Sequence, residues 1–547
     1  MAITKVTSSV LDVDIPAYKS FGTDSIMIGD TTTGTINAAD GNTGLGVDVF
    51  SALTSGDNNT AIGKGALTVT TTGSSNVAVG RHSMFTNTTG ASNVAVGLNS
   101  LYYNTEGGYN VAIGQQAMSA NTTGIRNVAL GYLALAGNTT AGYQTAIGYN
   151  SLVTVNGGLE NTALGANTLS LTSTGSYNTA IGTNALYANT TASRNTAVGH
   201  AALTANTTGA ENVAVGDATL DANTTGSNIT AVGRAALSSN TTGSNHTAVG
   251  LFTLINNTTG NNNTAIGYNA MLSNTTGYLN TAVGMQSLDS NTTGTDNVAL
   301  GYNTLGVNTT GANNVAIGSS ALGNNITSNN TAVGYNAGGA ITTGRYGVYL
   351  GDNSASGLTA GFGNVMIGFL SSPYAADSNY NIVIGDQCKG VNVGGYDDDY
   401  TFTFGRGTGS DRVYNMFDVN ASWTRVSDVR YKEEITDNTD CGLDFINDLR
   451  PVTFKWKPKA NIDSSLPDYN PEETERKHDG KMYGLIAQEV KEALDTHGIT
   501  DFGGWNEIDN GINTISQEMF VHPLIKAVQE LSAKNDALEA RIAALES

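Results

Sequence analysis

A serine and a lysine five positions apart, Ser427 and Lys432, form the pair with the most specific chemistry in this sequence. A serine hydroxyl becomes an effective nucleophile only when a base removes its proton. A lysine can be that base only if burial lowers the pKa of its amine. Side chains at this spacing point to opposite faces of a strand and lie about 140° apart around a helix. The backbone must therefore bend between them, or the lysine must come from a neighbouring chain.

Three motifs occur in order around this pair. Residues 427–432 read Ser-Asp-Val-Arg-Tyr-Lys, residues 446–456 read Ile-Asn-Asp-Leu-Arg-Pro-Val-Thr-Phe-Lys-Trp, and residues 483–490 read Tyr-Gly-Leu-Ile-Ala-Gln-Glu-Val. Together with a heptad helix at the end, they resemble the S74 peptidase family. These are the intramolecular chaperone domains at the ends of bacteriophage tail fibres and tailspikes. The resemblance covers residues 420–547.

This resemblance implies a domain that helps three chains assemble and then cuts itself off once per chain. The bond cut would be Val426–Ser427, before the serine itself. Ser427 and Lys432 would be the catalytic dyad, whereas Asp428 and Arg430 would orient the site or pair with each other.

Composition favours elongated parts over several compact domains. Of 547 residues, 67 are glycine and only 13% are charged, which is unusual for a compact enzyme. Only six lysines and arginines lie between Gly29 and Gly385, whereas 17 of the 25 follow Gly385. The net charge of −21 makes a nucleic acid an unfavourable partner.

The sequence lacks the usual signals for export and membrane insertion. Its first residues contain no basic start followed by an apolar run, and no run of 18 apolar residues occurs. We therefore expect synthesis in a cytoplasm and no membrane insertion.

Two cysteines, Cys388 and Cys441, are too few for a disulfide framework and lack metal-ligand spacing.

A glycine, here called the marker glycine, recurs every 17 residues from Gly29 to Gly385, with one spacing of 16 before Gly334. The best repeats, from Gly63 to Gly318, have Ala two positions before the marker and an aliphatic residue one position before it. Leu or Met stands four positions after the marker, and Asn-Thr-Thr-Gly is common further on. A 17-residue unit cannot bury its own apolar face, but stacked units can share a continuous core.

The repeat predicts a parallel β-solenoid or β-roll with one coil per repeat. Val, Ile and Thr favour strands, and proline is absent from residue 17 to 372. At about 4.8 Å per coil, the rod would be on the order of 100 Å long. The second glycine, ten positions after the marker, needs either small size or a positive φ. We expect the Ala and Gly positions to allow neighbouring chains to approach closely, and the aliphatic and Leu positions to fill each coil.

Asn-Thr-Ala-Val-Gly at 195–199 and Asn-Val-Ala-Ile-Gly at 110–114 resemble the repeats in trimeric autotransporter adhesin heads. Those heads are three β-rolls side by side. The period of 17 departs from that family's shorter repeat, so the resemblance leaves the shape of the coil open.

The predicted division is an attachment segment at 1–28, a solenoid rod at 29–385, a β-rich neck at 386–426 and an α+β chaperone at 427–547. A coiled coil should occupy about 521–547, because its apolar positions are spaced alternately by four and three. These positions are Leu524, Val528, Leu531, Asn535, Leu538, Ile542 and Leu545. By rule this seam favours two strands, but the family resemblance favours three.

Five tyrosines directly follow a marker glycine, which places them on one stripe of the rod: Tyr132, Tyr149, Tyr268, Tyr302 and Tyr335. Their rings could stack on sugars of a host polysaccharide, or they could be ordinary surface residues.

The three acidic residues at 397–399 indicate a solvated turn rather than a cation site. The histidines form no ladder, so we infer no metal and no cofactor.

The leading hypothesis is a homotrimeric phage tail fibre. Its partners would be a virion baseplate or another fibre protein, and a polysaccharide or protein on the host surface. Its location would be the virion. A bacterial surface adhesin of the trimeric autotransporter type and an ice-binding β-solenoid are the alternatives.

Overall fold

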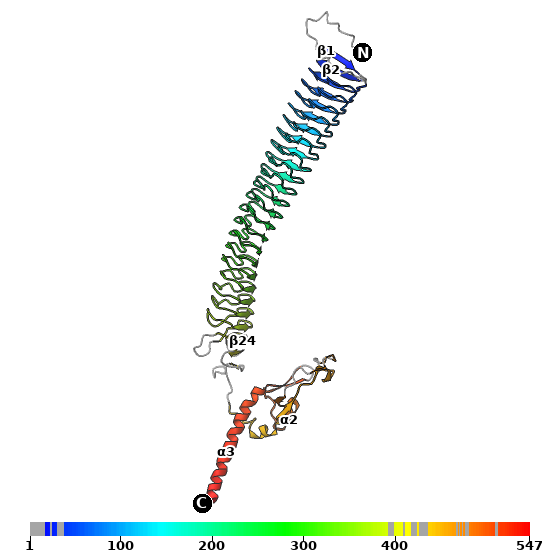
Figure 1. Ribbon diagram of the computed structural model, residues 1–547. Coiled ribbons are helices and arrows are strands. Elements are labelled where there is room, and N and C mark those ends of the chain that lie inside the picture. The colour runs from blue at the N-terminus through cyan, green and yellow to red at the C-terminus, as the bar shows by residue number, and fades with distance from the viewer. Residues whose placement is uncertain are drawn as a thin grey trace, which may run out of the picture. The chain divides into compact units, whose positions relative to one another are not determined.

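The computed structural model divides into two compact units, residues 1–426 and 427–547, which we describe separately. It describes residues 17–21, 24–29, 38–391, 399–408, 411–416, 424–425, 436–465, 481–508 and 512–546, and five positions between 469 and 475. The first unit is a long stack of coils, each contributing one strand (Figure 1). Among the described helices, none has both the length and the apolar character of a membrane span.

The first unit begins with β1 (Ala17–Phe21), β2 (Ser25–Gly29) and β3 (Thr43–Gly46). Its short strands are β4 (Thr60–Ile62), β5 (Val77–Val79), β6 (Val94–Val96), β7 (Val111–Ile113), β8 (Val128–Leu130), β9 (Thr145–Ile147), β10 (Thr162–Leu164), β11 (Thr179–Ile181), β12 (Thr196–Val198), β13 (Val213–Val215), β14 (Thr230–Val232), β15 (Thr247–Val249), β16 (Thr264–Ile266), β17 (Thr281–Val283), β18 (Val298–Leu300), β19 (Val315–Ile317), β20 (Thr331–Val333), β21 (Val348–Leu350), β22 (Val365–Ile367) and β23 (Ile382–Ile384). It ends with β24 (Thr401–Gly405), β25 (Arg412–Met416) and β26 (Thr424–Arg425).

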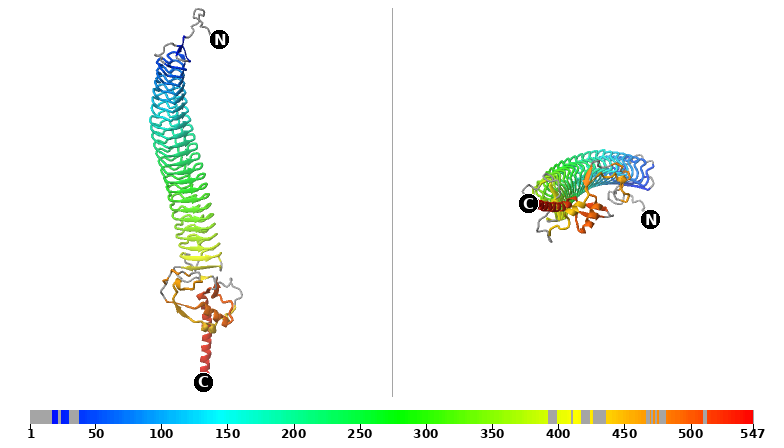
Figure 2. Two further views of the ribbon diagram at one scale, coloured as in Figure 1. Left: turned by 90° about the vertical axis from the view of Figure 1, so that its right-hand side faces the viewer. Right: turned by 90° about the horizontal axis from the view of Figure 1, so that it is seen from below.

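Each strand from β2 to β24 pairs in parallel with the next, so the strands form one continuous sheet. Most pairings join residues 17 apart, such as Ala197 with Ala214. The two ends differ: β1 pairs antiparallel with β2, and β24, β25 and β26 form antiparallel pairs. The predicted mainly β fold, a parallel solenoid of 17-residue coils, is confirmed (Figure 2).

The second unit is small and contains both helices and strands. Its elements are α1 (Leu443–Asp448), β27 (Val452–Phe454), the 3₁₀ helix η2 (Lys459–Asn461), β28 (Met482–Gly484), α2 (Ala487–Thr496), β29 (Trp505–Ile508), β30 (Ile512–Ile515), the 3₁₀ helix η4 (Gln517–Phe520) and α3 (Val521–Glu546). β27 pairs antiparallel with β28, and β29 with β30. The predicted small segment of helices and strands after the solenoid is therefore confirmed.

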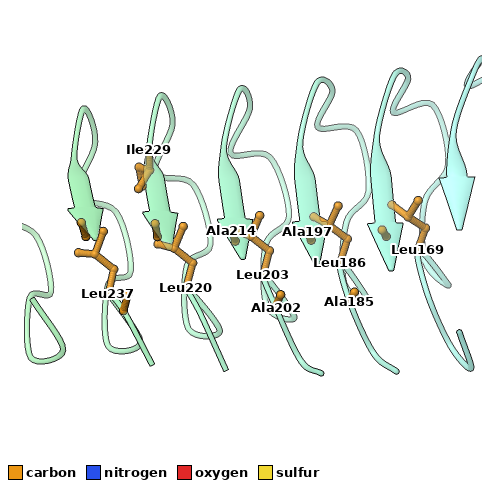
Figure 3. Packing of buried hydrophobic residues seen from close by; sticks show 14 of the residues in the cluster. Leu169, Ala185, Leu186, Ala197, Ala202, Leu203, Ala214, Leu220, Ile229 and Leu237 are labelled. Atoms are coloured by element: carbon orange, nitrogen blue, oxygen red, sulfur yellow. The ribbon is translucent and has the colours of Figure 1, made fainter. Parts of the chain in front are cut away.

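The interior of most coils holds one leucine or methionine and one alanine. Leu203 follows its marker glycine by four positions, and Ala214 lies at the centre of β13; both are fully buried. Figure 3 shows the leucines of successive coils stacked beside the alanines of the strands. Leu203 takes a left-handed backbone conformation with φ 54°, which is unfavourable for a branched side chain. Its burial, worth about 2 kcal/mol, offsets that strain.

The expectation for the alanine and aliphatic positions is wrong. The alanine faces into its own coil and does not face a neighbouring chain, whereas the aliphatic residue beside it faces outward. Ile181 and Leu130, for example, expose 37% and 43% of their surface. Adjacent residues of a strand point to opposite faces, and from β4 to β20 the inward residue is always alanine. We call the outward residues on either side of this alanine the strand-face stripe.

Two ladders of buried asparagines link successive coils; the first extends along most of the stack, and the second occupies two stretches, 87–138 and 189–308. In the first, Asn110 donates its backbone N–H to Asn93 Oδ1 (3.0 Å) and its Nδ2 to Gly124 O (2.9 Å). In the second, which begins each Asn-Thr-Thr-Gly motif, Asn104 Nδ2 donates to Asn87 Oδ1 (2.7 Å) and Gly107 O (3.0 Å). Each asparagine thus satisfies backbone groups that the turns would otherwise bury without partners.

Glycines are required at two places in each coil for different reasons. Marker glycines such as Gly199 have φ 142°, and a Cβ atom there would lie 2.2 Å from Gly216 O in the next coil. At the second glycine, Gly209 has no positive φ, but a Cβ atom would lie 2.2 Å from Gly226 O. Of the two requirements left open by the sequence, small size therefore explains the second glycine.

The single 16-residue repeat loses its residue in an outer turn. The carbonyl of Thr327 accepts hydrogen bonds from Asn314 Nδ2 (2.7 Å) and Asn325 Nδ2 (2.9 Å), as the carbonyl of the second glycine does in other coils. Thr327, and not Ser328, therefore occupies the place of the second glycine. The first asparagine ladder continues through this coil, since Asn330 donates its backbone N–H to Asn314 Oδ1 at 3.0 Å. The second ladder is interrupted, because Asn308 Oδ1 is buried without a hydrogen-bond partner among the described residues.

One coil near the end of the solenoid is packed differently. Tyr349 stands where β4 to β20 have the inward alanine, and its side chain is fully buried; Met366 and Val383 hold the same position in the next two coils. Glycine replaces the two neighbours that would collide with its ring: Gly338 stands at the leucine position and Gly347 at the asparagine position. Burial raises the pKa of Tyr349, and its hydroxyl has no hydrogen-bond partner among the described residues.

We predict that Tyr349→Phe stabilises the rod by about 1 kcal/mol, because it removes a buried hydroxyl without a partner. Tyr349→Ala should instead lose about 3–5 kcal/mol, because the two glycines leave a cavity. Thermal unfolding of the rod measures both changes. The triple variant Tyr349→Ala, Gly338→Leu, Gly347→Asn rebuilds an ordinary coil and should recover most of the loss. If Tyr349→Ala alone is as stable as the wild type, this account of the packing is wrong.

A second exception occurs in the first asparagine ladder, where His246 replaces asparagine. Its ring is buried, and Nδ1 accepts the backbone N–H of Asn263 at 3.3 Å. Burial lowers the pKa of His246 to about 4. The unfolded chain binds the proton more tightly, so stability is complete above pH 6.5 and falls as the pH drops from 6.5 toward 4.

We predict that the wild-type rod loses at most about 3 kcal/mol over this range through His246. His246→Asn, which restores the ladder residue, should remove that part of the pH dependence. His200→Asn, which replaces an exposed histidine of the rod, is the matched control. The measurement is the melting temperature of each variant at pH 7.5 and pH 4.5. Equal pH dependence in wild type and His246→Asn would contradict the prediction.

Candidate functional site

The residues predicted to cut the chain lie outside the described residues. These are Val426, Ser427, Asp428, Arg430 and Lys432. The structure therefore neither brings the serine and lysine together nor separates them. It does place the preceding residues: Arg425 and Thr424 of β26 pair with Val413 and Tyr414 of β25. The predicted scissile bond thus follows the last described strand of the first unit, where the two units divide.

A small aromatic core organises the second unit. Phe445 of α1 is buried against Phe502 and Phe520, with ring centroids 5.8 and 6.4 Å away. Val490 and Leu494 of α2 complete the cluster. α1, α2 and η4 therefore meet at this one cluster.

Polar contacts fix the helices around this core. Glu530 of α3 accepts the backbone N–H of Leu443 at 2.8 Å, which satisfies a free donor at the start of α1. Arg450 donates to both carboxylate oxygens of Glu489 at the start of α2. Hydrogen bonding to Arg450 lowers the pKa of Glu489, and the same contact raises the pKa of Arg450.

Much apolar surface of the second unit remains outside this core. In β28, Tyr483 exposes 72% of its surface, and Trp456, just after β27, exposes 58%. A cavity of about 370 Å³ lies between these strands and η4, lined by Val452, Leu485 and Phe520 among others. So small a core and so much open apolar surface are typical of a domain completed by association.

The coiled-coil seam predicted from the heptads lies on α3, and its apolar side chains are open to solvent. The exposed fractions are 52% for Leu524, 58% for Val528, 56% for Leu531, 58% for Leu538, 49% for Ile542 and 80% for Leu545. Within the chain, α3 buries only Pro523 and Ala527. The helix thus carries an apolar seam that no described residue of the same chain covers.

The strand-face stripe is a second open apolar surface, which the sequence reasoning missed. From β4 to β23, the first and last residues of each strand are Thr, Val, Ile or Leu, without a charged residue. The repeat contained the signal, because alanine and its aliphatic neighbour must face opposite sides of a strand. The repeat did not indicate whether the alanine or the aliphatic residue faces inward.

The predicted tyrosine stripe lies on the surface of the first unit. Tyr132, Tyr149, Tyr268, Tyr302 and Tyr335 are 41–59% exposed. The rings of Tyr132 and Tyr149, in adjacent coils, stack with centroids 5.7 Å apart. The others lie in coils further along, so the rings form one pair and three separate platforms.

Other candidate residues have structural surroundings. Cys388 and Cys441 are buried free thiols, and burial raises the pKa of both. Of the three acidic residues at 397–399, the first two lie outside the described residues, and Asp399 accepts hydrogen bonds from Asn379. Within the described part of the chain, no group of three His, Cys, Asp or Glu side chains is placed to hold a metal ion.

Comparison with known proteins finds a similarity in part of the second unit. Residues 427–499 match the model of the Peptidase_S74 family, described as chaperone of endosialidase. No curated protein and no solved structure shows significant similarity to the chain. The match begins at Ser427 and includes α1 and α2. Residues 427–499 are therefore similar to the chaperone of endosialidase, and their place after a long parallel β-solenoid in the sequence is consistent with a tail fibre or tailspike.

Proposed function

We propose that the protein is a homotrimeric bacteriophage tail fibre whose second unit assembles the trimer and then cuts itself off at Val426–Ser427. The rod would present a binding surface to a host cell, and the virion baseplate or another fibre protein would hold the fibre. The observation that carries the proposal is the uncovered seam of α3. A lone helix with such a seam exposes side chains that a coiled coil would bury.

The strand-face stripe supports the same assembly in the rod. An uncharged stripe of Thr and aliphatic residues over so many coils is suited to packing against another copy of the same surface. In this assembly the α3 helices of the chains would run parallel to one another, and so would their rods, so that all chains point in the same direction. The heptad rule alone favours two chains, and the S74 family favours three; we propose three.

Repeating coils create a register problem that the second unit would solve. If one rod shifts by one coil relative to another, nearly the same contacts form, so the stripe specifies alignment poorly. The α3 seam includes Asn535 at one seam position, and a polar residue there favours a single register. A chaperone that associates first would therefore fix the alignment before the rods pair.

The proposed cleavage uses the serine on the carboxyl side of the bond. Ser427 Oγ attacks the carbonyl carbon of Val426, neutral Lys432 takes the hydroxyl proton, and the amide nitrogen of Ser427 leaves with a proton from the lysine. Water then hydrolyses the resulting ester. Asp428 and Arg430 would orient the dyad, and backbone N–H groups would stabilise the oxyanion.

The first threonine of the Asn-Thr-Thr-Gly motif gives no support to the ice-binding alternative. An ice-binding face needs a row of outward hydroxyls, but Thr88 and Thr105 donate their hydroxyls to the carbonyls of Thr105 and Thr122 in the next coils. These hydroxyls strengthen the stack between coils and do not form a free outer row.

We predict that charge in the α3 seam abolishes the trimer. The double variant Leu531→Glu, Leu538→Glu places carboxylates where chains should meet, and it should yield aggregated or monomeric protein by light scattering. Ala533→Glu, exposed on the same helix away from the seam, is the matched control and should assemble normally. A gene lacking residues 427–547 should also fail to give soluble trimer. Normal trimers from that truncated gene would refute the chaperone role.

We predict that Ser427→Ala leaves an assembled, uncut chain of 56.4 kDa, and that Lys432→Ala does nearly the same. The wild type should show a new amino terminus at Ser427, formed at a rate independent of protein concentration once trimers exist. Ser422→Ala, a nearby serine outside the motif, should cut normally. Intact-mass measurement follows all four proteins. Undiminished cutting in Ser427→Ala would exclude this mechanism while leaving the trimer proposal standing.

A further inference from the structure

One position in each coil has a left-handed backbone and an outward side chain. It lies five residues before the marker glycine, and we call it the corner position. Asn228, Asn245 and Asn262 occupy it in three successive coils, with φ 57–60°. Asparagine suits this conformation better than most residues, because its short amide bonds to nearby backbone.

Seven earlier coils use poorly suited residues at the same position. In chain order these are Tyr109, Arg126, Tyr143, Glu160, Tyr177, Arg194 and Glu211, with φ 56–61°. The three tyrosines among them expose 50–65% of their surface, so they add little to the core in return for the strain. Residues that strain the backbone without helping the fold commonly serve a function.

Three of these residues form a compact arrangement on adjacent coils. The guanidinium carbon of Arg126 lies 5.8 Å from the ring centroid of Tyr109 and 5.3 Å from that of Tyr143. Arg126 Nη1 also donates a hydrogen bond to the hydroxyl of Tyr143. The arginine is thus held between two rings, although its side chain is exposed.

The charge of Arg126 is not neutralised by the chain. No carboxylate of the described residues lies within ion-pairing distance of it, whereas Arg194, at the corner position four coils on, lies 3.2 Å from Glu211. A guanidinium fixed between aromatic rings, with donors facing solvent, suits a planar anion such as a carboxylate or a phosphate. The flanking rings suit the apolar face of a sugar.

We propose that Tyr109, Arg126 and Tyr143 form a binding site for an anionic sugar chain, with the guanidinium on its carboxylate or phosphate and a tyrosine ring against a sugar on either side. Alternate coils are about 9.6 Å apart, from a strand spacing of about 4.8 Å. The two rings are therefore spaced to contact separate sugars of one chain. The site deepens the proposed host adhesion, on which its biological role rests.

The test measures saccharide binding to the full-length protein by calorimetry. Three hexasaccharides share one ring and differ in charge: mannohexaose, mannohexaose phosphorylated on O6, and the hexamer of mannuronic acid. At least one charged hexamer should bind at least tenfold more tightly than the neutral one. Comparing the two charged hexamers shows whether the site prefers a carboxylate or a phosphate. Equal binding of all three, or no binding of either charged hexamer, would overturn the proposal.

Variants locate the site without damaging the fold. Arg126→Asn and the double variant Tyr109→Asn, Tyr143→Asn install the residue that other coils carry at the corner position. They should weaken binding at least tenfold, with an unchanged or higher melting temperature and unchanged oligomeric state. Tyr177→Asn, at the same position two coils beyond Tyr143, is the matched control and should bind normally. Arg126→Lys keeps the charge but not the planar stacking, and should bind more weakly than the wild type.

Two outcomes separate this inference from the proposed function. If the wild type adheres to a bacterial surface and binds a charged hexamer, but the Asn variants do so equally well, the site is wrong and adhesion stands. If the Asn variants lose the trimer, the corner residues contact a neighbouring chain and the proposal fails. If the wild type binds a charged hexamer and the Asn variants do not, the site stands whether or not the protein is a phage fibre.

Discussion

The buried asparagine ladders are the constraint on which the rod depends. A coil of 17 residues has two tight turns, and each turn directs backbone groups inward where no water can reach them. Asparagine offers both a donor and an acceptor, so one side chain can bond to a carbonyl of its own or a neighbouring coil and to the asparagine of the adjacent coil. The bonds between asparagines form only if adjacent coils present these side chains at the same height, which is why the repeat length is so strict.

Exceptions to the repeat follow from the same constraint. One coil accommodates a changed core residue because its neighbours change in volume with it, as around Tyr349, and another accommodates a missing residue in an outer turn, beside Thr327. Ile229, buried in the first ladder, has no polar side chain, yet its backbone N–H still donates to Asn212 Oδ1 at 3.1 Å. The ladder can therefore lose single side chains as long as the backbone groups keep their partners.

The sequence was sufficient for the architecture of the rod but not for the orientation of its side chains. A repeat of 17 residues with Val, Ile and Thr before glycine excludes most folds other than a parallel solenoid. Whether Ala197 or Val198 faces inward depends on the width of the coil, which no local pattern records. The left-handed conformation of residues such as Leu203 and Tyr109 is also invisible in a sequence, because these residue types ordinarily avoid it. The predicted dyad, Ser427 and Lys432, stays a prediction, since both residues lie outside the described part of the chain.

The antiparallel strands at the two ends of the solenoid have a consequence for its polymerisation. A parallel stack is open at both ends, and an uncovered terminal coil could template the coil of another molecule and grow into a filament. β1 at one end and β25 with β26 at the other occupy those edges with strands of opposite direction. They act as caps of the kind that repeat proteins need for solubility. The rod therefore has a length set by its gene, and molecules that meet end to end do not fuse.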